Sequence, residues 1–161
     1  MPDQFIARRP EDLPSREEIA AMSGLEFIRA IHEGRLPGAP IAALMDFRMH
    51  EVEPGRVVFR GTPRFEHMNP QGTIHGGWYG TVLDSAMGCA VATMLPKGRG
   101  YTTLEYKINL TRALPIGMTV DCEARVQHIG RSTGVAEGTI RGVEDGKLYA
   151  TGSTTCIVLG G

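Results

Sequence analysis

The sequence predicts an α+β protein in which an antiparallel β-sheet wraps around one long central helix, with an extra helix before it. Between Gly76 and Leu95, apolar residues recur at three- and four-residue steps, which indicates a helix. Several later segments alternate residue by residue, which indicates strands that bury one face. Helices and strands do not alternate along the chain, so a parallel sheet is not expected.

The composition fits one soluble domain. The chain has 161 residues, 42% of them apolar and 22% charged, with a formal net charge of −1. The near-neutral charge argues against nucleic-acid binding, the N-terminus lacks the apolar segment of a signal peptide, and no stretch is long enough to span a membrane. Three widely spaced cysteines (Cys89, Cys122 and Cys156) favour reduced thiols in a cytoplasmic protein.

The N-terminal part divides into two regions. Residues 1–14 contain three prolines and mixed charges, and are expected to be flexible. Residues 15–161 are expected to form a single domain, with an N-terminal helix in 15–34 and the core in 43–160. Ser15 and Glu18 have the spacing of a capping box, Gly24 offers a break in this helix, and Gly34 is suited to end it.

The strands are predicted from alternation and from the turns between them. They are expected at 43–52, 56–65, 102–110, 118–129, 133–143 and 147–158. One face of the segment 133–143 is nearly bare, so a helix could approach it closely; this face carries Gly134, Ala136, Gly138, Ile140 and Gly142.

The stretch from Asn69 to Asp84 carries the chemical signal. At helical spacing, a stripe of small residues would contain a single carboxylate, Asp84; the stripe consists of Gly77, Gly80, Thr81, Asp84 and Gly88. Each interior glycine costs a helix about 1 kcal/mol relative to alanine. The stripe therefore predicts either tight packing or a channel in which a ligand's reactive group lies beside Asp84.

The start of this helix offers a complementary group. Its first amides have no intrahelical acceptor, and the helix dipole adds partial positive charge there. An exposed amide at Gly76 could therefore stabilise the oxyanion of an acyl-transfer reaction. Asp84, two turns further on, could act as a general base or a nucleophile, and Asn69 and His75 could orient a carbonyl or a water.

The motif resembles the signature of hotdog-fold thioesterases, in the branch that contains PaaI-like and 4-hydroxybenzoyl-CoA thioesterases. The residues at the family's spacing are Asn69, Gly72, His75, Gly76, Gly77 and Asp84. The order of elements from about 43 to 158 resembles that family too. The resemblance implies a cytoplasmic hydrolase of small, aromatic or medium-chain acyl-CoA substrates, with no cofactor beyond the coenzyme A of the substrate. It also implies a homodimer, or a dimer of dimers forming a homotetramer.

The resemblance also assigns roles to residues. Asp84 would be the catalytic carboxylate, attacking the thioester or activating water, and the Gly76 amide of the opposite subunit would polarise the thioester carbonyl. His75 and Asn69 would position the carbonyl or the water. A hydroxyl residue is expected on the strand after the helix, with Thr103 as the first candidate and Thr102 as the alternative.

Substrate contacts are expected at Gly77, Trp78, Thr102, Arg131 and Ser132. Arg131 and Ser132 lie in a predicted turn where the family tends to place residues that meet coenzyme A, and Arg112 is a further option. Trp78 and Tyr79 would either line the acyl channel or pack in the core. The N-terminal helix would either cover the acyl pocket or extend a dimer.

Two other functions stay open at this stage. A hotdog hydratase or dehydratase typically pairs a histidine with an acid across the site, whereas His75 precedes the helix as in thioesterases. A non-catalytic acyl-CoA-binding protein would be expected to lack Asp84. A cysteine nucleophile is not expected, because Cys89 lies five residues past Asp84 on a different helix face. No metal site is expected either, because the five histidines lack ligand spacing.

Overall fold

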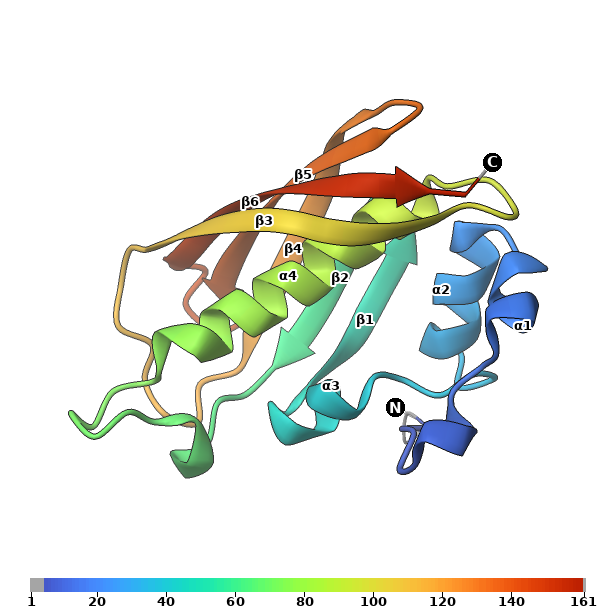
Figure 1. Cartoon of the computed structure of the whole chain (residues 1–161). Coiled ribbons are helices and arrows are strands. Elements are labelled where there is room, and N and C mark those ends of the chain that lie inside the picture. Colours follow the sequence, from blue (N-terminus) through green and yellow to red (C-terminus); the bar gives the residue numbers. More distant parts are fainter. Residues whose placement is uncertain (1–4, 161) are drawn as a thin grey trace.

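The computed structural model describes residues 5–160 (Figure 1). Of the segment 1–14 that was expected to be flexible, residues 1–4 lie outside the described part. The remainder makes defined contacts, since Ile6 bridges Gly38, Ala7 is buried, and a 3-10 turn, η1, spans Pro10–Asp12.

The described residues form four α-helices and six strands. The helices are α1 (Arg16–Ala20), α2 (Gly24–His32), α3 (Pro40–Leu44) and α4 (Gly76–Thr93). The strands are β1 (Phe47–Glu53), β2 (Arg56–Gly61), β3 (Gly100–Leu110), β4 (Val120–Ile129), β5 (Thr133–Gly142) and β6 (Leu148–Leu159).

The six strands form one antiparallel sheet in the order β1-β2-β4-β5-β6-β3. Figure 1 shows this sheet curving around α4, with α1 and α2 beside the C-terminal end of α4. Twelve of the 18 residues of the long central helix are buried. The predicted α+β architecture, an antiparallel sheet wrapped around a central helix, is therefore confirmed.

Glycines on β5 allow the sheet to approach α4 closely. A Cβ atom at Gly134 would lie 2.8 Å from Cγ1 of Val91, and one at Gly138 would lie 3.0 Å from Cδ2 of Leu83. Both separations are shorter than ordinary van der Waals contact. The bare face predicted for residues 133–143 is thus the surface that receives the helix.

The predicted N-terminal helix is divided into α1 and α2. Ser15 caps α1 by accepting a hydrogen bond from the Glu18 amide at 3.2 Å, as the capping-box spacing predicted. A second capping box, from Ser23 to Glu26, begins α2 at Gly24, the position that offered a break. The sequence analysis overlooked this second box, which is the physical reason for the division.

The first predicted hairpin is shorter than expected at both ends. Pro40 begins the short helix α3, because its fixed φ suits the first helical position, so the strand starts at Phe47 instead of residue 43. Strand β2 ends at Gly61, and a 3-10 turn, η2, follows at Phe65–His67. Pro63 lacks the amide hydrogen that a longer ladder would need.

Gly24 fixes α2 against α4, which yields a prediction about stability. Its amide donates to the carbonyl of Leu95 at 2.9 Å, and a Cβ atom here would overlap the carbonyl oxygen of Ala92. We expect Gly24→Ala to lower the free energy of unfolding by about 1–3 kcal/mol, as overpacking does. Urea denaturation would measure the change. Gly100→Ala is the control, because a Cβ at Gly100 would meet nothing within 4 Å. Its loss of unfolding free energy should therefore be clearly smaller.

Candidate functional site

Asp84 lies half-buried on α4, where β3 passes beside the helix. The hydroxyl of Thr103 donates a hydrogen bond of 2.9 Å to Oδ1 of Asp84. Thr102, the alternative candidate, is exposed and belongs to the opposite face of the strand. The geometry therefore places Thr103, and not Thr102, next to the carboxylate, and leaves Oδ2 of Asp84 without a hydrogen-bond partner among the described residues.

A cavity of about 460 Å³ opens beside Asp84, and we call it the Asp84 cavity. Its volume falls within the range typical of small-molecule sites, about 300–1,000 Å³. Its wall carries polar groups on α4 and β3: Asp84, Ser85, Cys89, Tyr101 and Thr103. The remainder is apolar: Leu13, Pro14, Ile19, Phe27, Ile28, Ile31, Pro37, Gly38, Ala39, Ala42, Phe47, Met49 and Phe59.

Cys89 shares this cavity, although its spacing from Asp84 predicted a different helix face. The cavity is wide enough to reach both faces. Burial, with the negative charge of Asp84 as a second cause, raises the pKa of the Cys89 thiol to about 12. The thiol is then protonated at neutral pH and is a weak nucleophile, which supports the choice of the carboxylate over the cysteine.

Two glycines of the helix stripe are explained by packing. A Cβ atom at Gly80 would lie 3.2 Å from the hydroxyl oxygen of Tyr106, and one at Gly88 would lie 2.8 Å from that of Tyr101. Both tyrosines come from β3 and cross the helix at these positions. Of the two explanations for the stripe, tight packing therefore applies to Gly80 and Gly88, whereas open space lies beside Asp84.

His75 caps the start of α4. Its Nδ1 accepts a hydrogen bond from the Gly77 amide at 2.8 Å, so a neutral ring carries its proton on Nε2. The Gly76 amide has no acceptor among the described residues. One unsatisfied donor is thus left at the positive end of the helix dipole, with His75 holding the backbone around it.

Asn69 uses its side chain within the loop that precedes α4. Its Oδ1 accepts hydrogen bonds from the amides of Gln71 and Thr73, at 3.0 and 3.2 Å, and its Nδ2 donates to Oγ1 of Thr73 at 2.8 Å. Gly72, with φ of 80°, completes the turn. These bonds give Asn69 a local role in shaping the approach to the helix start.

Gly76 and Asp84 lie far apart within one chain. They are eight residues apart on the same helix, which corresponds to about 12 Å at 1.5 Å per residue. A single thioester carbonyl cannot contact both groups of one chain. A group that acts with Asp84 on the same carbonyl must therefore come from another part of this chain or from a second chain.

Residues 71–149 match the thioesterase superfamily. The fold is similar to a mutant structure of the phenylacetic acid degradation protein PaaI from Thermus thermophilus. The TM-score is 0.67, with 26% identity over 73% of this chain and 97% of that chain. The chain has the hotdog fold and is similar to the thioesterase superfamily over residues 71–149. The predicted resemblance is thus confirmed.

Two further relatives are similar to this chain. A Streptococcus mutans protein, whose structure contains bound acetyl-CoA, has a TM-score of 0.66 and 27% identity, over 71% of this chain and 90% of that chain. A candidate esterase of Caenorhabditis elegans is 28% identical over 109 residues, which are 68% of this chain. The match spans 64% of that relative, which is less than two thirds of its length.

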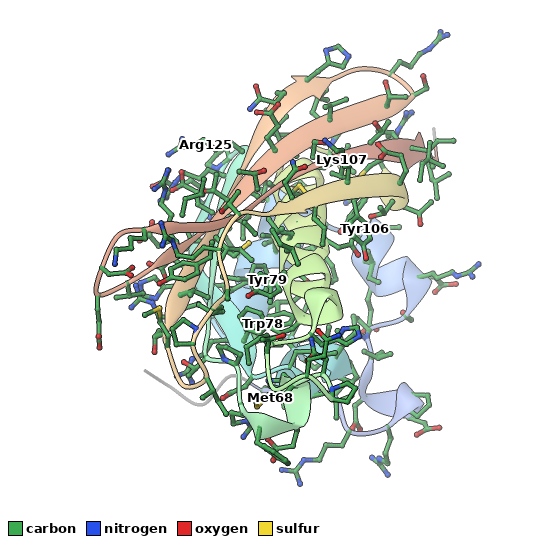
Figure 2. All side chains as sticks on the ribbon, turned by 90° about the vertical axis from the view of Figure 1, so that its left-hand side faces the viewer. Met68, Trp78, Tyr79, Tyr106, Lys107 and Arg125 are labelled. Carbon is green, nitrogen blue, oxygen red and sulfur yellow. The ribbon has the colours of Figure 1, made fainter. Side chains whose placement is uncertain are left out.

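The two aromatic residues after the glycine pair, Trp78 and Tyr79, pack in the core of the protein (Figure 2). Trp78 and Tyr79 are 1% and 2% exposed. The indole N–H donates to the carbonyl of Met45 at 2.8 Å, and the phenol oxygen accepts from the Leu114 amide at 2.9 Å. Neither residue lines the Asp84 cavity, so the geometry favours core packing over an acyl-channel role.

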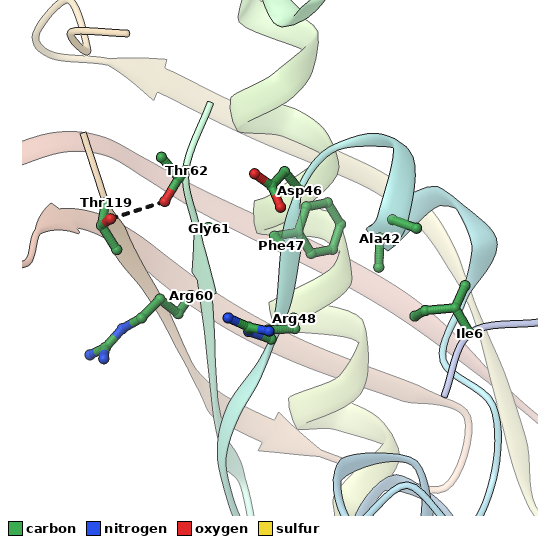
Figure 3. Close-up of a pocket in the computed structure, with 10 residues that line it drawn as sticks. Ile6, Ala42, Asp46, Phe47, Arg48, Arg60, Gly61, Thr62 and Thr119 are labelled. Carbon is green, nitrogen blue, oxygen red and sulfur yellow. Dashed lines mark hydrogen bonds between the residues drawn. The ribbon is translucent and has the colours of Figure 1, made fainter. Parts of the chain in front are cut away.

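A second hollow lies at the start of α4. It measures about 400 Å³ and is lined in part by His75, Gly77, Trp78 and Thr81. Its lining includes both sequence neighbours of Gly76, and Gly76 itself is partly exposed. A third hollow, of about 300 Å³, lies between Asp46, Arg48 and Arg60, with Thr62 and Thr119 hydrogen-bonded at its edge (Figure 3). No predicted site residue lines this third hollow.

The candidate coenzyme A contacts lie at the ends of β3. Arg131 and Ser132 are exposed in the turn between β4 and β5. Arg99, which the sequence analysis overlooked, donates from Nη2 to the Arg131 carbonyl at 2.6 Å and adds a second cation there. Arg112 follows the other end of β3, about 33 Å away along an eleven-residue strand. Asp84, beside Thr103, lies nearer the Arg99 end.

Neither a metal-binding cluster nor a membrane-spanning helix occurs in the described part of the chain. Among residues 5–160, no three His, Cys, Asp or Glu side chains gather closely enough to hold a metal ion. In the same part of the chain, no helix is long and apolar enough to cross a membrane.

Sequence reasoning missed the apolar residues that line the Asp84 cavity. Ile28 and Ile31 of α2 and Phe47 and Phe59 of the first hairpin read in the sequence as ordinary core residues. They lie outside residues 71–149, where the family match falls. Helical spacing places Ile28 and Ile31 on one face of α2, but spacing alone does not say what that face covers.

Proposed function

We propose that this protein hydrolyses acyl-CoA thioesters, with Asp84 as the catalytic carboxylate. The observation that carries the proposal is the half-buried carboxylate of Asp84, hydrogen-bonded to Thr103 at the polar end of an apolar cavity. The cavity offers space for an acyl group beside the carboxylate. Cys89, the other potential nucleophile in it, has a pKa raised to about 12 by burial and by Asp84.

The chemistry requires one free carboxylate oxygen. Because Thr103 engages Oδ1, Oδ2 is available to accept a proton from water or to attack the carbonyl carbon. In the water route, the new C–O bond forms as the proton passes to Asp84, the C–S bond breaks, and the coenzyme A thiolate leaves and takes up a proton. Thr103 acts here as a positioning residue for Asp84.

The oxyanion donor in this proposal is the Gly76 amide of a second copy of the chain. The separation of about 12 Å within one helix prevents Gly76 and Asp84 of one chain from meeting the same carbonyl. A dimer is supported by β3, which lies at an edge of the described sheet and exposes three large apolar side chains, Leu104, Tyr106 and Leu110. In this arrangement His75 and Asn69 position the amide.

Recognition of coenzyme A is supported by the relative that binds acetyl-CoA. In this chain, Arg99 and Arg131 bring two guanidinium groups to one turn near the Asp84 end of β3. Guanidinium groups suit phosphate oxygens because they donate in a planar fork. We assign this turn, together with Ser132, to the phosphates of coenzyme A.

The test is release of free coenzyme A thiol from a panel of acyl-CoA substrates. We expect thiol release that depends on enzyme concentration for at least one uncharged acyl-CoA. Tight binding without release would contradict hydrolysis and favour a binding protein. Hydration of crotonyl-CoA without thiol release would contradict hydrolysis and would favour a hydratase.

A further inference from the structure

The N-terminal helices form a wall of the Asp84 cavity. Phe27, Ile28 and Ile31 of α2 line it together with Ile19 of α1. Ile28 and Ile31 are only 2% and 9% exposed, so these side chains belong to the body of the protein. Of the two roles considered for the N-terminal helix, the geometry favours covering the acyl pocket.

Polar and apolar side chains line different walls of the Asp84 cavity. The polar groups lie on α4 and β3, around Asp84 and Thr103, whereas the lining residues of α2 and of the first hairpin are apolar. Phe47 and Phe59 meet edge-to-face, with ring centroids 5.6 Å apart, and form part of the apolar wall. A thioester whose carbonyl lies at Asp84 would therefore direct its acyl group toward α2 and these rings.

We propose that the Asp84 cavity selects uncharged hydrocarbon acyl chains of medium length, and that Ile28 of α2 limits the chain length. The inference rests on the function proposed above and adds the substrate class to it. The cavity holds more space than an acetyl group needs, and its apolar wall stabilises each added methylene by removing it from water.

The same wall excludes charged acyl groups. Neither lysine nor arginine is among the described residues that line the cavity, and its one charged residue is the carboxylate of Asp84. A terminal carboxylate, as in succinyl-CoA, would lose its hydration without gaining a cationic partner, and would also be repelled by Asp84. Charged chains are therefore rejected by desolvation as well as by repulsion.

The first experiment measures kcat/KM for acetyl-, butanoyl-, hexanoyl-, octanoyl- and succinyl-CoA. We expect kcat/KM to rise about fourfold for each added methylene until the cavity is filled, and succinyl-CoA to fall on the order of 10²-fold below hexanoyl-CoA. Equal kcat/KM across the uncharged series, or a preference for succinyl-CoA, would overturn the inference while leaving hydrolysis established.

Two variants at Ile28 test the limit on chain length. Ile28→Phe fills the cavity, and we expect the hexanoyl-to-acetyl ratio of kcat/KM to fall on the order of tenfold, the equivalent of about two methylenes. Ile28→Ala enlarges the cavity and should raise the octanoyl-to-hexanoyl ratio. Arg29→Ala is the matched control, because Arg29 is exposed on the next position of α2. Folded Ile28 variants with unchanged ratios would contradict the assignment.

A binding measurement separates this inference from the proposed function. Calorimetry would measure the affinity of the Asp84→Asn variant for the same uncharged acyl-CoA series. This measurement requires neither turnover nor a substitution at Ile28. If affinity rises with chain length but the wild-type protein releases no thiol, the hydrolase proposal is wrong and the assignment of the cavity to acyl chains stands. Affinity that is independent of chain length would remove the cavity assignment even where the wild type hydrolyses acetyl-CoA.

Discussion

Asp84→Asn should lower kcat for acyl-CoA hydrolysis by about 10³-fold, within the range of 10²–10⁴ for loss of a general base. The amide has the size of the carboxylate, and its oxygen can still accept the hydrogen bond from Thr103, which is 2.9 Å long in the wild type. The change therefore removes charge and basicity while keeping the local packing. Steady-state kinetics with the preferred acyl-CoA would measure the effect.

The control for this variant is Glu144→Gln, the same chemical change in the exposed turn between β5 and β6. It should leave kcat within about twofold of the wild-type value, because surface substitutions away from the site generally have small effects. Equal melting temperatures of wild type and Asp84→Asn would exclude unfolding as the cause of any loss. A folded Asp84→Asn protein with wild-type kcat would eliminate Asp84 as the catalytic carboxylate.

Gly76→Pro should lower kcat by about 10²–10³-fold, the loss typical for one oxyanion-hole donor. Proline removes the amide hydrogen that has no acceptor among the described residues. The first helical position tolerates proline, and His75 already has ψ of 136°, which suits a residue before proline. The substitution therefore deletes the donor while the start of α4 is preserved.

Gly76→Ala is the matched control, since it keeps the amide hydrogen. Its Cβ would lie 3.4 Å from Cδ1 of Leu110, which is an ordinary contact. We expect the alanine variant to retain most of the activity that the proline variant loses. Equal losses in the two variants would mean that the Gly76 amide does not stabilise the oxyanion.

A mixing experiment extends this prediction to the two-chain site. If Asp84 and Gly76 of different chains share one site, a hybrid dimer of Asp84→Asn and Gly76→Pro contains one doubly altered site and one unaltered site. Unfolding the two inactive variants together and refolding them should restore activity that neither variant has alone. No recovery from a verified hybrid dimer would place both groups in the same chain's site, or show that one of them is not used.

Several predictions that depend on neighbours in sequence agree with the structure. The periodicity predicted a helix from about Gly76, and α4 begins there; the capping box at Ser15 is formed. The turn at residues 53–55 joins β1 to β2 as expected. Such features depend on hydrogen bonds and side-chain contacts within a few residues, so the local pattern contains the information that they need.

Predictions that depend on distant partners were less complete. The glycine stripe suggested a channel, but Gly80 and Gly88 are covered by Tyr106 and Tyr101, whose positions depend on how β3 crosses α4. Trp78 was a candidate for substrate contact, and its side chain is buried, with the indole N–H donating to the Met45 carbonyl. The alternation of β3 left Thr102 and Thr103 open until the strand was placed against the helix.

The sequence by itself determined the α+β class, the central helix and the motif that joins His75 to Asp84, because these follow from periodicity and short spacings. Only the tertiary structure decided that Thr103 bonds to Asp84 and that α2 walls a cavity beside it. Its walls come from segments between residues 13 and 103 that share no local pattern. They meet because packing their apolar faces around α4 removes that surface from water.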